Sequence, residues 1–311
     1  MKEKFRRSLE NNDAVLLRSI PKADRHCHSL LGGKIETAER MLGRKLMRSP
    51  ERMNGIIDMN SYLGDAFSFD LTSGIIAALV EATLLTAKED GVTVLEASLD
   101  CSNTRYYDGG ASEMTEAIDA VHKRVAPGIK LIPQLGMIRE WEIAELETMT
   151  AECIDTGYFR SIDLYSREDA RAPDEFMGIY ANARGHGLRL KAHVGEFGDA
   201  EMVRHTVEAL DLDEVMHGIG AAESPDVMAF LAERGTVLHV CPTSNIRLGA
   251  AGSIRSHPIR ALFDAGVRVT VNSDDILVFG STVSEEFLTL YRAGLFDADE
   301  MDTIREWGLE I

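Results

Sequence analysis

Eight short apolar runs, each about the length of a β-strand, recur along this chain and alternate with amphipathic segments. The runs lie at residues 23–28, 92–99, 130–136, 159–165, 188–194, 214–217, 236–240 and 268–272. Helical periodicity marks the segments 112–125, 140–154, 172–184, 200–210, 225–234 and 254–265. Strands that alternate with helices form parallel sheets, and eight such units predict an α/β fold, a (β/α)8 TIM barrel.

The alternative to a barrel is a doubly wound open sheet. No glycine-rich phosphate loop follows any of the runs, which disfavours that alternative. Residues 34–90 are longer than one crossover helix requires, so we expect extra helices between strands one and two, over the mouth of the barrel. Residues 1–20 are expected to form a helix before the first strand. We interpret residues 1–311 as one barrel domain.

Charge and cysteine usage limit the partners and the compartment. The net charge of −18 leaves no basic surface for nucleic acid, although a small nucleotide in a local pocket remains compatible with it. The four cysteines form no C-x-x-C pair, and no apolar leader segment follows the charged N-terminus, so we expect a cytoplasmic protein. The longest apolar stretch, residues 71–87, contains Glu81 and predicts a buried helix rather than a membrane span.

Four polar segments stand where four of the predicted strands end. They contain His26 and His28, then His193 and Glu196, then His217, and finally Asp274 and Asp275. Active sites of barrels lie at the C-terminal ends of the strands, so these side chains are expected to converge. His26 and His28 are two residues apart and therefore face the same side of a strand. Histidines and a carboxylate from separate strands are typical of a hydrolytic zinc site that activates water.

Each of these residues also has a purely structural interpretation. His217 fits a hydrogen-bonded core histidine, Asp274 fits a helix N-cap, and Glu196 fits a surface carboxylate. Only their convergence on one rim of the barrel favours the functional interpretation.

At these positions the chain resembles the adenosine deaminase family of one-zinc barrel deaminases. The resemblance rests on five motifs, in the family's order, between about residue 21 and about residue 290. They are Pro21 to His28, His193-Val194-Gly195-Glu196, Met216-His217-Gly218, Cys241-Pro242-Thr243-Ser244-Asn245 and Asn272-Ser273-Asp274-Asp275.

The resemblance implies a cofactor, a substrate class and a role for each residue. One Zn²⁺ per chain is implied, with the ligands His26, His28, His193 and Asp274. The implied substrate is a 6-aminopurine nucleoside, adenosine or a close analogue. Glu196 is implied to protonate the purine N1, His217 to orient or deprotonate the attacking water, and Asp275 to hold N7. Ser166, Leu30 and Gly195 are implied to contact the substrate.

Two departures from the family pattern leave the substrate open. The family places an acidic residue just after the second histidine, whereas this chain has Ser29-Leu30-Leu31-Gly32-Gly33-Lys34. The leucines suit an apolar 5′ group and the glycines a phosphate, although a tight turn is the simpler interpretation. Ser166 replaces a usual glycine. Adenine, a 5′-modified adenosine and an N6-substituted adenine or AMP therefore remain alternatives, and the oligomeric state stays open.

The remaining candidates receive structural interpretations. His122, His186 and His205 are expected at the surface or at helix caps, Cys27 and Cys241 as buried apolar groups, and His239 as an inward-facing residue that binds no metal. His257 is a minor candidate near the rim, and Lys191 a candidate for carboxylation in a two-metal hydrolase. A silent, ligand-binding relative and a two-metal amidohydrolase are the competing functions.

Overall fold

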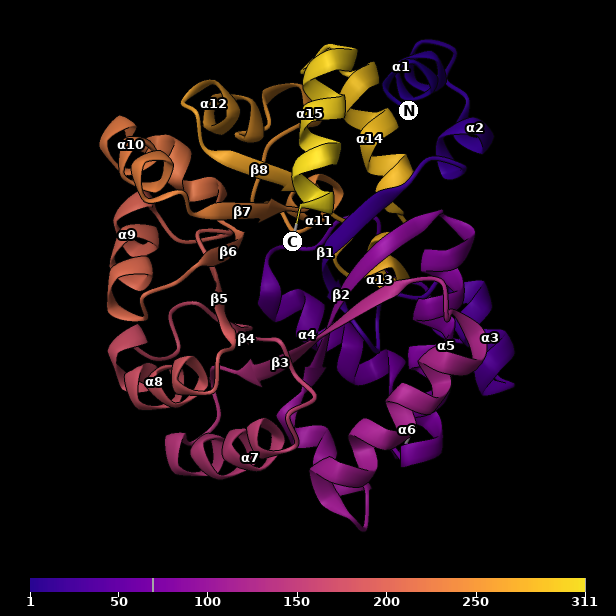
Figure 1. Cartoon of the computed structure of the whole chain (residues 1–311), viewed down its shortest axis with the longest axis vertical. Helices are drawn as coiled ribbons and strands as arrows, with labels where there is room; N and C mark the ends of the chain where they lie inside the picture. The colour runs from indigo at the N-terminus through magenta and orange to yellow at the C-terminus, as the bar shows by residue number, and fades with distance from the viewer. Residues whose placement is uncertain (69, 311) are drawn as a thin grey trace.

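The computed structural model describes residues 1–68 and 70–310, and its centre is a barrel of eight parallel strands. The strands are neighbours in sequence order from β1 to β8 (Figure 1). Their bounds are β1 (Lys22–His28), β2 (Val92–Asp100), β3 (Lys130–Ile138), β4 (Ser161–Tyr165), β5 (Arg189–Val194), β6 (Glu214–His217), β7 (Val237–Val240) and β8 (Arg268–Val271). Every predicted strand is confirmed, and each predicted end lies within two residues of the observed one.

The barrel closes where β8 returns to β1. The backbone N–H of Asp274 donates to the carbonyl of His26 at 2.9 Å, and Asp274 forms a parallel bridge with Cys27. Two residues before Asp274, the side chain of Asn272 makes a second link, because its Oδ1 accepts the backbone N–H of Arg25 at 2.7 Å. These bonds exclude the open doubly wound sheet. They also bring Asp274, beyond the end of β8, beside the histidines of β1.

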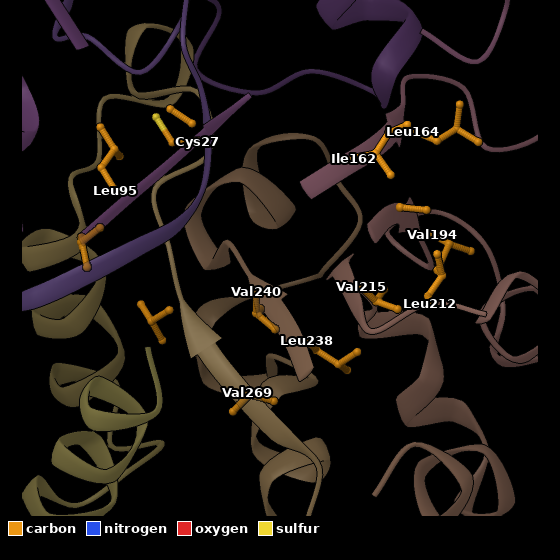
Figure 2. Close-up of a cluster of buried hydrophobic side chains, with 14 of the residues drawn as sticks. Cys27, Leu95, Ile162, Leu164, Val194, Leu212, Val215, Leu238, Val240 and Val269 are labelled. Carbon is orange, nitrogen blue, oxygen red and sulfur yellow. The ribbon is translucent and has the colours of Figure 1, made fainter. Parts of the chain in front are cut away.

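Helices surround the strands and bury the outward faces of the barrel (Figure 1). Along each strand one set of alternate side chains points inward and the other packs against the helices. Valine and leucine dominate the outward set, including Val194, Val215, Leu238 and Val269 (Figure 2). The covering elements are η1 (Cys101–Tyr106), α6 (Gly110–Val125), α7 (Ile143–Asp155), η2 (Pro173–Phe176), α8 (Met177–Gly185), α9 (Ala200–Ala209), η3 (Ile219–Glu223), α10 (Pro225–Arg234), α11 (Pro242–Arg247), η4 (Ile254–Ser256), α12 (Ile259–Asp264), α13 (Ile276–Phe279), α14 (Val283–Arg292) and α15 (Ala298–Leu309).

The long segment between β1 and β2 forms extra helices, as predicted. They are α3 (Ile35–Leu42), α4 (Ile56–Ala66) and α5 (Ser73–Glu89). Helices α3 and α5 pack together, and the apolar stretch at residues 71–87 lies mostly within α5. Among the described residues, no helix has both the length and the apolarity to cross a membrane.

Two predicted helices are interrupted. Residues 1–20 form α1 (Lys2–Glu10) and α2 (Ala14–Arg18), because Asn12 adopts a left-handed backbone with φ of 54° and Asp13 caps the second helix through the N–H of Leu16. The predicted helix over residues 254–265 is divided into η4 and α12. The residue before a proline avoids helical geometry, and His257, which precedes Pro258, is extended there.

Candidate metal centre and active site

The four predicted metal ligands meet at the C-terminal mouth of the barrel. Nε2 of His26 lies 3.0 Å from Nε2 of His193. Oδ1 of Asp274 lies 3.5 Å from Nε2 of His26 and 3.6 Å from Nε2 of His28. Nitrogen and carboxylate atoms from β1, β5 and the end of β8 therefore lie close together in overlapping sets of possible metal ligands, which also include His217, Cys241 and Asp275.

Hydrogen bonds at the opposite ring nitrogens show that this cluster fits a cation. Nδ1 of His26 lies 3.1 Å from the carbonyl of His239, and Nδ1 of His193 lies 3.1 Å from Oδ1 of Asp163. A carbonyl and a carboxylate only accept, so both Nδ1 atoms carry the proton and both Nε2 atoms keep a lone pair. Two lone pairs at 3.0 Å repel each other unless a cation lies between them.

The electrostatics also favour ligation. Burial lowers the pKa of His28 and of His193 to about 4, and it lowers the pKa of His26 well below its usual value. The rings are therefore neutral near pH 7, the form that binds metals.

Strained backbone accompanies the site. Ser166, His217 and Asp274 have φ values of 80°, 63° and 59°, in the left-handed region that favours glycine. Residues of this kind persist where the surrounding fold over-determines them, which is common at functional sites.

Glu196 and His217 face this cluster from β5 and β6. Nε2 of His217 lies 3.5 Å from Oε2 of Glu196 and 3.9 Å from Oδ2 of Asp274. Burial, followed by the charges of Asp274 and Glu168, raises the pKa of Glu196 well above its usual value. Glu196 is therefore suited to hold a proton near neutrality and to donate it.

Asp275 presents an unused polar atom to the same space. Its Oδ1 is buried and has no hydrogen-bond partner. Burial and the neighbouring Asp274 and Glu196 raise the pKa of Asp275 well above its usual value. A protonated carboxyl group without a protein partner is suited to donate a hydrogen bond to a ligand.

These groups line a cavity of about 450 Å³. One side is polar and includes His193, Glu196, His217, Asp274 and Asp275. The other side is apolar and comes from α4 and the segments beside it: Leu30, Leu31, Ile56, Met59, Leu63, Phe67, Leu71, Leu79 and Leu248. None of the described residues that line this cavity is a lysine or an arginine.

Two of the three predicted substrate contacts line this cavity, and the third does not. Leu30 and Ser166 line the cavity, and the hydroxyl of Ser166 donates to Oε1 of Glu140 at 2.9 Å. Gly195 is not among the lining residues, and a Cβ there would lie 2.2 Å from Val203. Its contact with a substrate stays a prediction, whereas its φ of 71° and its close packing explain the glycine.

The segment after His28 forms a tight turn, as its simpler interpretation predicted. The backbone N–H groups of Leu31 and Gly32 donate to the carbonyl of His28 at 2.9 and 2.8 Å. A Cβ on Gly32 would lie 2.3 Å from Sγ of Cys27. Close packing against β1 therefore accounts for this glycine without a phosphate.

Two residues near the site had no predicted role. Glu168 accepts four backbone N–H groups of the loop after β5, those of Gly195, Glu196, Phe197 and Gly198, at 2.6 to 3.3 Å. The buried guanidinium of Arg139 donates to the carbonyls of Glu168 and His193 at 3.2 and 3.1 Å. Together they connect the segments after β3 and β4 with β5 and the loop that follows it, and no spacing in the sequence indicates these contacts.

A charged layer lies inside the barrel below the cluster. Nζ of Lys191 lies 2.6 Å from Oε1 of Glu96 and also contacts Glu214. The His239 ring hydrogen-bonds Glu214 and Thr270, so it faces inward as predicted, and only the backbone carbonyl of His239 contacts a predicted ligand. The two carboxylates compensate the Lys191 ammonium group, which argues against carboxylation of this lysine.

The other histidines and the cysteines have the structural roles predicted for them. His122, His186 and His205 bind a carbonyl or carboxylate near helix ends or at the surface. Burial raises the pKa of Cys27 and Cys241 well above the usual value, so both remain neutral thiols.

Comparison with known proteins agrees with this geometry. A family model described as adenosine deaminase matches residues 103–311. A putative adenosine/adenine deaminase of Treponema pallidum is 37% identical over 279 residues, which cover 89% of this chain and 93% of that protein.

Two solved structures share the fold. An adenine deaminase from Arthrobacter aurescens has a TM-score of 0.81 at 23% identity and covers 93% of this chain and 92% of its own. An amidohydrolase from Burkholderia ambifaria with bound Zn has the same TM-score and identity, covering 94% and 86%. The barrel, the site and the extent of the match to the Treponema relative lead to one conclusion: the chain belongs to the adenosine deaminase family of hydrolytic deaminases.

Proposed function

We propose that this protein deaminates a 6-aminopurine nucleoside, adenosine or a close analogue, to the 6-oxo purine and ammonia. The observation that carries the proposal is the position of Glu196. This buried carboxyl group, with a raised pKa, faces the cavity beside the metal-ligand cluster and the unpartnered Oδ1 of Asp275. A proton donor, a cation site and a second donor around one cavity suit hydrolysis of an aromatic amidine.

The proposed cofactor is one Zn²⁺ per chain, held by His26, His28, His193 and Asp274. Imidazole nitrogens and a carboxylate oxygen are ligand types that zinc binds in proteins. When bound, zinc supplies a nucleophile near neutral pH by lowering the pKa of water.

The side chains of this protein supply the proton, orient the water and bind the purine. Glu196 gives its proton to N1 of the purine, which makes C6 more electrophilic, while His217 orients the water that adds there. Asp275 donates a hydrogen bond to N7. The oxygen of the water stays on C6, one of its protons leaves with the amino group as ammonia, and the other restores Glu196.

The cavity supports an uncharged substrate that is larger than the bare base. About 450 Å³ lies within the range that encloses a ligand of drug size. The described lining of the cavity includes no lysine or arginine, so a phosphate would find no basic side chain to pair with. AMP and its N6-substituted form are therefore disfavoured. Leu30 and Leu31 suit a 5′-deoxy or 5′-alkylthio group as well as an unmodified ribose.

Adenine is the second candidate substrate. The Treponema relative carries both substrates in its name, and the Arthrobacter structure is of an adenine deaminase. The groups assigned to N1, C6 and N7 act on the base alone, so they serve adenine equally well.

A substrate panel tests the proposal. Zinc-loaded protein is incubated with adenine, adenosine, 2′-deoxyadenosine, 5′-deoxyadenosine, 5′-methylthioadenosine, N6-methyladenine and AMP, and ammonia is measured. We expect a nucleoside to have the highest kcat/KM and AMP the lowest among compounds that react. Glu196→Gln, which keeps an oxygen for Asn245, is expected to lower kcat by about 100- to 10,000-fold. Binding without turnover on every compound would instead favour a silent relative.

A further inference from the structure

The side-chain amide of Asn245 stands between the two groups that face the reacting centre. Its Nδ2 lies 2.9 Å from Oε1 of Glu196 and 3.1 Å from Nδ1 of His217. All three side chains are buried. The orientation of this one amide therefore decides which atoms of Glu196 and His217 can carry a proton toward it.

His257 fixes the orientation of the Asn245 amide through a further hydrogen bond. Nδ1 of His257 accepts the backbone N–H of Ile259 at 3.2 Å, so the proton of the neutral ring is on Nε2. Burial lowers the pKa of His257 to about 4, which keeps the ring neutral at pH 7. Nε2 of His257 lies 3.3 Å from Asn245, and because it is a donor, the amide atom that meets it is Oδ1.

The orientation of Asn245 in turn determines the tautomer of His217. With Oδ1 directed at His257, Nδ2 donates to both Glu196 and His217. Nδ1 of His217 is then an acceptor, and the proton of its neutral ring lies on Nε2. This Nε2–H points toward Oε2 of Glu196 and Oδ2 of Asp274, where the cluster lies.

The histidines around the centre thus divide into two kinds. His26 and His193 carry the proton on Nδ1 and present a lone pair on Nε2, as ligands do. By position, His217 could join them, because its nitrogen lies within ligand distance of both. Its tautomer is the opposite one, so it presents an N–H group that no metal ion can bind.

We propose that His257 and Asn245 are positioning residues that hold His217 as its Nε2–H tautomer. In this form His217 donates a hydrogen bond to the oxygen that adds to the purine, and it is excluded from the metal ligands. The catalytic half of this inference rests on the proposed deamination. The tautomer itself does not, and it is measured separately.

The direct test is the protonation pattern of the rings in zinc-loaded protein labelled with ¹⁵N in histidine. Long-range ¹H–¹⁵N correlations distinguish the protonated from the unprotonated ring nitrogen, and His217→Asn identifies the signals of His217. We expect His217 to be protonated on Nε2 and unprotonated on Nδ1. A proton on Nδ1 of His217 overturns the proposal, whatever substrate the enzyme accepts.

Asn245→Asp tests the two hydrogen bonds that connect His257 to His217 through residue 245, with almost no change in the shape of the side chain. A carboxylate accepts from His257 but cannot donate to His217, so the proton of His217 is expected to move to Nδ1. We expect kcat to fall by about 10- to 100-fold with KM and zinc content little changed. Wild-type kcat together with the wild-type tautomer overturns the proposal.

His257→Gln and His257→Phe separate hydrogen bonding from packing. Glutamine keeps an N–H donor and is expected to recover most of the kcat that phenylalanine loses. Ser244→Ala is the matched control, because this neighbouring hydroxyl is buried without a hydrogen-bond partner, and its loss should leave kcat unchanged. Equal losses in the glutamine and phenylalanine variants, with His217 still protonated on Nε2, would refute the positioning role of His257.

Discussion

Glu168 accepts the backbone N–H of Glu196 at 3.0 Å, so one buried carboxylate holds another in position. The same carboxylate accepts the N–H groups on either side of Glu196, and its charge contributes to the raised pKa of that residue. The loop after β5 is thus held in place by a residue of the segment that follows β4. The role proposed for Glu196, to protonate one ring nitrogen, requires such support.

Glu168→Ala is expected to lower kcat more than Glu168→Gln. Alanine leaves four N–H groups without an acceptor, at about 1.5–3 kcal/mol for each bond to a charged group that is not replaced by water. Glutamine keeps one oxygen to accept them. Steady-state kinetics and thermal unfolding of both variants provide the measurement, and an alanine variant with wild-type kcat would contradict the role.

Removal of the metal is expected to abolish ammonia release and to lower the thermal midpoint. A ligand that binds only the folded state stabilises it by about 2.7 kcal/mol at a free concentration 100 times its Kd. Metal analysis after dialysis against a chelator, followed by titration with zinc, should give one equivalent per chain. His193→Ala should lose the metal, while the exposed His205→Ala should keep it; two equivalents in the wild type would favour the two-metal hydrolase.

Asp275→Asn is expected to retain more kcat/KM than Asp275→Ala. The amide of asparagine still donates a hydrogen bond to N7, whereas alanine removes the donor and leaves the ring nitrogen unpaired. The difference should be about 10- to 100-fold, the value of one hydrogen bond of about 1.5–3 kcal/mol. Kinetics on adenosine and on its 7-deaza analogue check the assignment, because the analogue should respond equally to both substitutions.

Glu286→Gln is expected to make stability less sensitive to pH. Burial raises the pKa of Glu286 from 4.5 to about 7 although the N–H of Thr243 donates to it. The folded state therefore binds this proton more tightly than the unfolded state, and the contribution to stability is lost as pH rises from about 4.5 through about 7. The full shift corresponds to about 3 kcal/mol.

Thermal midpoints at pH 5 and pH 8 measure this effect. Glutamine stays neutral, so the variant should gain on the wild type at pH 8 relative to pH 5. The exposed Glu233→Gln serves as control and should show no such gain. A constant difference between variant and wild type at both pH values would refute the linkage.

The barrel and the ligand cluster were predictable because local patterns carry them. Apolar runs of strand length indicate β-strands, and polar residues at their ends must meet once eight parallel strands close. The break at Pro258 also had a local signal, which the helical periodicity of the segment concealed. Helix α15, which packs on β1 and β8, was not predicted, because the recognised alternation of strands and helices ends at β8.

The supports of the site were not predictable, for a physical reason. Glu168 accepts hydrogen bonds from four residues that lie 27 to 30 positions further along the chain. From the sequence alone, any acidic residue of the loop that contains Glu168 could have been the acceptor. The contact from His257 to Asn245 depends on the turn at Pro258, which lifts the ring out of a helix that the periodicity predicts. Side-chain orientation of this kind follows from packing, not from spacing.

The lining of the cavity, in which no described residue is a lysine or an arginine, also has a consequence for the proposed deaminase in a cell. Most adenine there is carried by anionic phosphate esters, which greatly outnumber free base and nucleoside. A cavity whose described lining offers no lysine or arginine gives those esters no basic side chain to pair with, so we expect them to compete weakly for the site. Turnover by the proposed deaminase is therefore expected to follow the supply of dephosphorylated purine and to respond little to the energy charge of the cell.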